Sequence, residues 1–132
     1  MSARENILNA IARNQPKLID VPVIDQNVII RYEDKYAQFK TVLESIGGQT
    51  ELISDVAILK KQLIADKQSG DFVVNAIEEL GDIDNQIAEF TAFELEKIEK
   101  AYIKGTVGVA ENGAVWVFES QMINRLVPFI CQ

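Results

Sequence analysis

Apolar residues recur at helical spacing near the start of the chain, bounded by residues that begin and end helices. Ser2-Ala3-Arg4-Glu5 has the S-x-x-E form of a capping box and predicts a helix that ends soon after Arg13. A second helix is expected over roughly Glu33–Ile46, and Gly47-Gly48 supplies a left-handed stop. Between the two, Lys17–Arg31 shows no clear period, which is typical of an extended connector.

The middle of the chain alternates between strand and helix patterns. Gln49–Ile53 predicts a short strand, Ser54 is placed to cap the helix that follows, and Phe72–Asn75 predicts a second strand. A strand, a helix and a strand in so short a stretch predict a parallel βαβ unit. Thr91-Ala92-Phe93-Glu94 is a further capping box, and the helix that it opens is expected to continue as far as Tyr102. Gly81–Glu89 is acidic and its structure is ambiguous.

The pair Asn112-Gly113 lies between two apolar runs and predicts a two-residue β-hairpin turn, because both turn positions need positive φ. Pairing outward from this turn sets Val109 opposite Trp116. One face of the hairpin is then bulky, and we expect Trp116 to be packed in the core. The other face is flattened by Gly108 and Ala110, so that a helix backbone or a ligand has room to approach closely.

The last part of the sequence predicts a short helix and a strand. Ser120 is placed to begin a helix over Gln121–Leu126, and Pro128 then introduces the apolar run Phe129–Cys131, which we expect to be a buried strand. An uncovered strand edge recruits another chain. We therefore expect a homo-oligomer that forms through the C-terminal region, or a poorly ordered C-terminal region.

Composition excludes more chemistry than the motifs add. The 132 residues contain no histidine and a single cysteine, Cys131, so this chain alone cannot form a Ser-His or Cys-His pair, an intrachain disulfide or an iron–sulfur ligand set. The net charge of −7 disfavours nucleic acid and anionic membranes as partners. The sequence shows no signal-peptide pattern and no apolar run long enough to span a membrane, so we expect a cytoplasmic protein.

The segment from Ile103 to Val117, IKGTVGVAENGAVWV, resembles the lactate-utilisation (LUD) domain family, in particular its LutC-like members. The family has a hairpin whose tip reads Ala-Glu-(Thr/Asn)-Gly, followed by an Arg, a Leu-rich turn and a Pro. The matching positions here are Ala110, Glu111, Asn112, Gly113, Arg125, Leu126 and Pro128. Family members continue to a Gly-Pro-Ser-(Lys/Arg)-Thr-Ala-Asp loop that this sequence lacks, so we expect residues 1–132 to be a single LUD-like domain, incomplete at its C-terminus.

The resemblance implies an α/β fold with three layers, α/β/α, built on a partly parallel sheet and a β-hairpin. This fold is similar to that of the sugar-phosphate isomerase and CoA-transferase (NagB/RpiA/CoA-transferase-like) superfamily. The resemblance also implies a function: a subunit of a bacterial system that oxidises L-lactate to pyruvate. Such a subunit works beside partner proteins that carry iron–sulfur clusters, and it holds no cofactor of its own.

Three groups of residues are candidates for ligand binding. Glu111, at a rigid tip with Asn112 and Gly113, is able to accept a hydrogen bond from a ligand hydroxyl or to act as a base, and the alternative is a solvated turn. Arg125 is able to bind the carboxylate of a 2-hydroxy acid, and the alternative is a cation at a helix C-terminus. The third group is the segment Lys104-Gly105-Thr106, whose backbone amides are able to bind an anion, and the alternative is a plain turn. Its candidate residues are Gly105 and Thr106.

A cluster of carboxylates in the middle of the chain favours a solvated acidic face over an Mg²⁺ or Ca²⁺ site, so no metal is predicted. Its members are Glu78, Glu79, Asp82 and Asp84. Two other functions stay open. One is an enzyme of the sugar-phosphate isomerase and CoA-transferase-like superfamily that binds a small anionic metabolite. The other is a purely structural or interaction domain.

Overall fold

The computed structural model describes residues 2–131, which divide into the units Met1–Arg31 and Tyr32–Gln132. The first unit consists of helix α1 (Ala3–Arg13) and a connector without regular secondary structure, and this confirms both predictions. In the capping box, the Ser2 backbone N–H donates to the Glu5 carboxylate at 2.6 Å, and the Glu5 N–H donates to Ser2 Oγ at 3.3 Å. These bonds satisfy backbone donors that the first turn leaves free.

The second unit begins with helix α2 (Lys35–Ser45), which also confirms its prediction. Asp34 caps the helix, because its carboxylate accepts from the Ala37 N–H at 2.9 Å. At the other end, Gly47 has a φ of +93° and the Gly48 N–H donates to the Leu43 carbonyl at 2.9 Å. This bond from Gly48 back to Leu43 is the Schellman motif, which requires the left-handed conformation at the glycine before it.

The predicted βαβ unit is wrong in its first strand. Residues 49–53 form no strand, and α3 (Val56–Gln68) is capped by Asp55, whose carboxylate accepts from the Ala57 N–H at 2.8 Å. Ser54 therefore does not cap it. Strand β1 (Val73–Asn75) pairs in parallel with β2 (Lys100–Tyr102) instead, so that Val74 lies opposite Ala101.

The helix expected to continue to Tyr102 is accordingly much shorter. Helix α4 (Ala92–Leu95) begins at Thr91, whose backbone N–H and hydroxyl both donate to the Glu94 carboxylate at 2.8 Å. Beyond Leu95 the chain straightens into β2, because β1 is buried and its backbone groups need a partner. The apolar spacing does not reveal this pairing, since it is a contact between distant parts of the chain.

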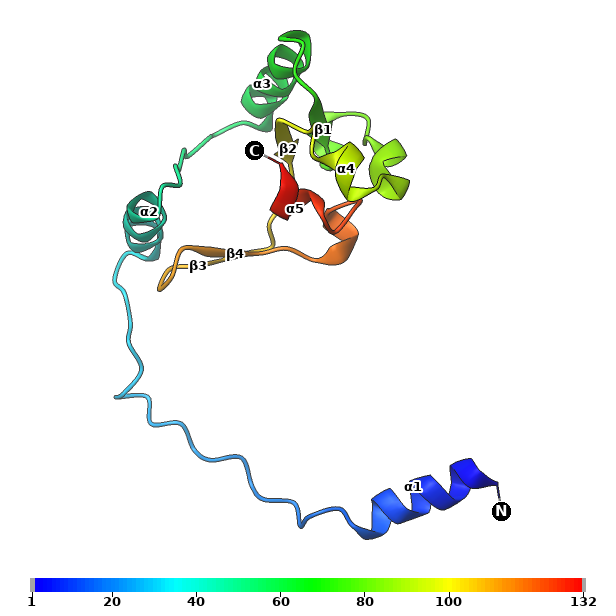
Figure 1. Ribbon diagram of the computed structural model, residues 1–132. Coiled ribbons are helices and arrows are strands. Elements are labelled where there is room, and N and C mark those ends of the chain that lie inside the picture. The colour runs from blue at the N-terminus through cyan, green and yellow to red at the C-terminus, as the bar shows by residue number, and fades with distance from the viewer. Residues whose placement is uncertain (1, 132) are drawn as a thin grey trace. The chain divides into compact units, whose positions relative to one another are not determined.

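Helical segments cover both faces of the β1–β2 pair (Figure 1). Val73 packs with Leu63 of α3 and with Leu80 of the 3-10 helix η1 (Glu78–Leu80). The neighbouring Val74 belongs to a second buried cluster, because successive side chains in a strand point to opposite faces. That cluster contains residues of the 3-10 helix η2 (Asn85–Glu89), of α4 and the turn after it, and of α5 (Val127–Ile130). Its other members are Ile87, Leu95, Ile98 and Val127.

The predicted hairpin exists, but its turn has four residues rather than two. Strand β3 (Val107–Val109) pairs antiparallel with β4 (Ala114–Trp116), so that Val107 lies opposite Trp116. Gly113 has a φ of +70°, whereas Asn112 does not have positive φ. Asn112 instead accepts the Ala114 N–H on its side chain at 3.0 Å, and this closes a wider turn. The register is displaced by two residues from the prediction, which leaves the two faces unchanged.

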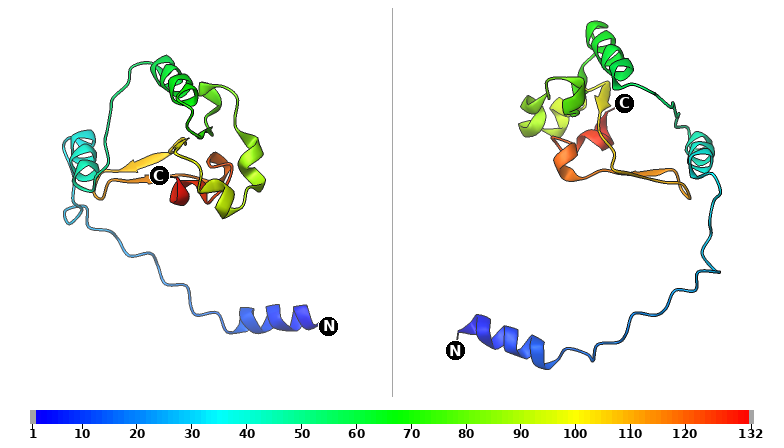
Figure 2. Two further views of the ribbon diagram at one scale, coloured as in Figure 1. Left: turned by 45° about the horizontal axis from the view of Figure 1, so that its top comes forward. Right: turned by 180° about the vertical axis from the view of Figure 1, so that it is seen from behind.

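Helix α2 lies against the flat face of the hairpin, beside its tip (Figure 2). Gly113 is buried there, and a Cβ at this position would lie 3.2 Å from the backbone nitrogen of Leu43. A Cβ at Gly108 would lie 3.3 Å from the ring of Phe39. The sequence allows either a helix backbone or a ligand on this face, and in the structure the helix α2 occupies it. The bulky face is open, and Trp116 is 62% exposed, so the prediction of a core tryptophan is wrong.

The C-terminal segment differs from both of its predictions. The expected helix over residues 121–126 is reduced to the 3-10 helix η3 (Glu119–Gln121), and the expected strand after Pro128 is the helical turn α5. Proline fits the first turn of a helix because its fixed φ is helical and its missing N–H is not needed there. Within residues 2–131, no helix has both the length and the apolar character needed to cross a membrane.

Replacing Gly113 by alanine should destabilise the second unit more than replacing Gly70 by alanine. Both glycines have positive φ, which costs an alanine roughly 1–2 kcal/mol, but a Cβ at Gly70 meets nothing within 4 Å. The Gly113→Ala variant also pushes against α2, so its midpoint of urea unfolding should fall further. Equal midpoints for the two variants would contradict the packing of α2 on the hairpin.

Candidate functional site

An open groove of about 530 Å³ lies between strand β4 and the C-terminal segment. Its lining residues are apolar except for Arg125, the only charged lining residue in the part of the chain that the structure describes. The apolar lining residues include Val115, Trp116, Met122, Leu126, Pro128 and Phe129. A concave apolar surface with a single well-placed polar group is typical of a small-molecule site.

Hydrogen bonds fix the β4 wall of the groove. The Thr106 N–H donates to the Trp116 carbonyl at 2.8 Å, and this extends the hairpin ladder by one bond. The side-chain oxygen of Gln121 then accepts from the Thr106 hydroxyl at 2.9 Å and from the Phe118 N–H at 2.8 Å. The Trp116 indole is packed edge to face against the Phe118 ring, with 6.4 Å between their centres. Gln121 therefore ties the base of the hairpin to the segment that forms the opposite wall.

The opposite wall depends on an unusual turn around Ile123. This residue has a φ of +60°, and the Asn124 N–H donates to the Met122 carbonyl at 2.6 Å. A hydrogen bond from the N–H of residue i+2 to the carbonyl of residue i, with positive φ at the residue between them, defines a γ-turn of the rare and strained kind. For a β-branched residue such as isoleucine, this backbone conformation costs about 1–3 kcal/mol. It also ends the helix that the sequence predicts here.

The side chain of Asn124 holds this strained turn in place. Its amide nitrogen lies within hydrogen-bond distance of the carbonyls of Ile87, Ala88 and Phe90, at 3.1, 3.3 and 3.1 Å. Its oxygen accepts from the Leu126 N–H at 3.1 Å. One carboxamide thus connects the groove wall to η2 and to the residue that follows it. Apolar spacing does not indicate this role, although asparagine is a residue whose side chain competes with helix formation through local hydrogen bonds.

Arg125 follows the locked turn directly and is exposed. Among the described residues, its guanidinium makes no ion pair and donates no hydrogen bond, so its five donors face solvent or a ligand. The alternative explanation, a cation that stabilises a helix C-terminus, does not apply, because no helix ends at Arg125. Of the sequence candidates, Arg125 is the one that lines this groove.

The other candidates lie apart from the groove lining. Glu111 is exposed at the hairpin tip, and Gly113 beside it is buried against α2. Thr106 uses its N–H and hydroxyl within the hairpin base. A Cβ at Gly105 would overlap the Val115 side chain, so this glycine allows close packing behind the groove. The structure therefore brings none of these residues together with Arg125.

A second polar cluster, which the sequence did not indicate, lies at the carboxyl end of β1. Asn75 is fully buried, and its side chain bonds to the backbone of Ile77 and Asp82 at 3.0–3.1 Å. Its N–H donates to the Asp84 carboxylate at 2.7 Å, and Lys67 pairs with the same oxygen at 2.8 Å. Burial raises the pKa of Asp84, but these hydrogen bonds outweigh it and hold the pKa below its ordinary value. This cluster orders the loop after β1.

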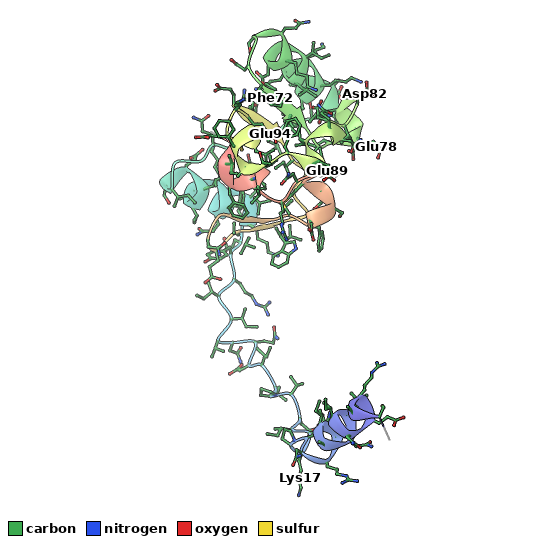
Figure 3. All side chains as sticks on the ribbon, turned by 45° about the vertical axis from the view of Figure 1, so that its right-hand side comes forward. Lys17, Phe72, Glu78, Asp82, Glu89 and Glu94 are labelled. Carbon is green, nitrogen blue, oxygen red and sulfur yellow. The ribbon has the colours of Figure 1, made fainter. Side chains whose placement is uncertain are left out.

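The acidic residues of the middle segment do not converge. Glu79 pairs with Lys104, and Figure 3 shows Glu78 and Asp82 at the outer edge of the second unit. Within residues 2–131, no group of three or more Cys, Asp or Glu side chains is arranged to hold a metal ion. Cys131 packs against the cluster that contains Val74, as expected of a core thiol.

No family model matches this chain, and neither a curated protein nor a solved structure is significantly similar to it.

Replacing Asn124 by aspartate should lower the free energy of unfolding by about 2 kcal/mol, because the carbonyls around this position would then face a carboxylate in place of the NH2 donor. Asn112→Asp is the matched control, since the Asn112 side chain only accepts a hydrogen bond, which aspartate retains. Thermal unfolding should show a fall of several degrees for Asn124→Asp alone. Equal stability of the two variants would show that Asn124 does not hold the turn.

Proposed function

We propose that this chain is a LutC-like subunit of a bacterial lactate-utilisation system, which binds the substrate or product carboxylate at Arg125 and carries no iron–sulfur cluster. The observation that carries the proposal is the position of Arg125 as the one charged group in an otherwise apolar groove. L-lactate and pyruvate each carry a carboxylate and a methyl group on the same carbon atom. A guanidinium binds a carboxylate through two parallel hydrogen bonds, and the apolar walls accept the methyl group.

The chemistry of the groove favours a subunit over a stand-alone enzyme. Oxidation of lactate removes two electrons and two protons from the substrate, so the reaction needs an electron acceptor and a base. A guanidinium group does not serve as a base, and the other charged candidate, Glu111, is outside the groove lining. In the proposal, the iron–sulfur partner proteins accept the electrons, and this chain positions the organic acid.

The proposal includes the fold that the resemblance implies, a three-layer α/β/α architecture similar to that of sugar-phosphate isomerases and CoA transferases. Its support is the arrangement of β1 and β2, which are parallel and covered by α3 on one face and by η2, α4 and α5 on the other. The expected working place is the cytoplasm.

An interaction domain is the second candidate, and exposed aromatic residues favour it. Trp116, Phe118 and Phe129 are 62%, 53% and 84% exposed, and all three lie in or beside the same C-terminal region. Exposed aromatic residues near an arginine are enriched at protein interfaces. In this proposal, the C-terminal region is covered by a partner or by a second copy of the chain.

Growth on L-lactate tests the first proposal. A lactate-utilising bacterium without its own LutC-like gene should regain growth when it expresses this chain or the Arg31→Gln variant. The Arg125→Gln variant should lose most of that growth, because it keeps the shape of the groove but removes the guanidinium. Arg31→Gln makes the same change of charge in the connector, outside the groove.

Two results would contradict the proposal. The first is absence of growth with the unchanged chain when the protein is present and folded. The second is full growth with Arg125→Gln. This result would rule out a functional carboxylate site at Arg125 and would favour the interaction domain as the function of the chain.

A further inference from the structure

The groove is larger and more apolar than a three-carbon acid requires. Its volume of about 530 Å³ falls in the range of roughly 300–1,000 Å³ that suits drug-sized ligands. The apolar wall runs from Trp116 to Leu126 and Phe129, so lactate bound at Arg125 would leave most of it uncovered. The uncovered surface is what an apolar tail on the ligand would occupy.

The charge of the site selects a particular head group. One guanidinium, with no partner among residues 2–131, matches one carboxylate. A phosphate carries close to two negative charges, and a chain with a net charge of −7 and a single cation at the groove disfavours it. Charge complementarity therefore points to a monoanion.

We propose that the groove binds an amphipathic carboxylate, an organic acid with an aromatic or branched aliphatic tail. The carboxylate lies on the Arg125 guanidinium, and the tail lies over Trp116, Leu126 and Phe129. Aromatic tails are favoured further, because the Trp116 ring, which packs edge to face with Phe118, offers an aromatic surface at the groove. The inference rests on the proposed function for the carboxylate site, and it narrows the acids that the site takes.

The single tryptophan of the chain reports directly on the groove. Trp116 emission is titrated with 3-phenylpropionate, with 3-phenylpropanol, which has the same tail without the charge, and with L-lactate, which has the charge without the tail. The acid with the tail should saturate at a concentration at least tenfold lower than either of the others. The full chain is used at a concentration at which light scattering shows a constant mass.

Two pairs of variants separate the head from the tail. Arg125→Gln should remove the preference for 3-phenylpropionate over 3-phenylpropanol, whereas Arg31→Gln should retain it. Phe129→Ala should weaken the binding of 3-phenylpropionate at least threefold and leave the binding of lactate unchanged. Phe93 is exposed and lies outside this groove, so Phe93→Ala should change neither affinity.

Four results would overturn the inference. The acid and the alcohol bind equally, or lactate binds as tightly as 3-phenylpropionate, or Arg125→Gln binds like the unchanged chain. The fourth is Trp116 emission that changes with protein concentration alone, because the groove is then covered by a second copy of the chain.

Growth on lactate distinguishes the two proposals. If the chain restores growth but shows no preference for the tail, the inference fails and the lactate role stands. If the chain prefers the acid with the tail but does not restore growth, the lactate role fails and the inference about the groove stands.

Discussion

The groove depends on one side chain, the carboxamide of Asn124. Its nitrogen lies within hydrogen-bond distance of two backbone carbonyls of η2 and of the Phe90 carbonyl that follows, and so it holds Ile123 in a backbone conformation that isoleucine rarely adopts. That turn interrupts the helix that the sequence predicts over residues 121–126, and Arg125 lines the groove together with residues of β4. Backbone strain of this kind persists only where the surroundings hold it, and it is often found at functional sites.

The site is chemically simple. A single cation lies in an apolar groove on a chain with seven excess negative charges, so the selectivity available to it is for a monoanion with an apolar part. Among the described residues, the groove lining combines one charged side chain with apolar ones, and this combination suits the binding and positioning of an organic acid. The polar cluster of Asn75 and Asp84 orders the loop after β1, because its hydrogen bonds are made within that loop and to Lys67 of α3.

The elements that the sequence predicted correctly are those with local causes. The capping box of α1, the glycine stop after α2 and the existence of the hairpin each follow from residues within a few positions of one another. The pairing of β1 with β2 and the groove itself join residues that are far apart in the chain, and apolar periodicity carries no information about them. The glycine-flattened face lies between these cases. The sequence predicts that a helix backbone or a ligand has room to approach this face closely, and in the structure α2 occupies it.

The most direct test of the carboxylate site is a ¹H–¹⁵N NMR titration that follows two kinds of side-chain signal, the Trp116 indole N–H and the arginine Nε–H groups, with 3-phenylpropionate as the probe. The account predicts that the Arg125 Nε–H and the Trp116 indole move together along one binding curve, while the Nε–H groups of the other arginines stay in place. Movement of the indole without Arg125, or of all arginines to the same extent, would contradict a carboxylate site in this groove.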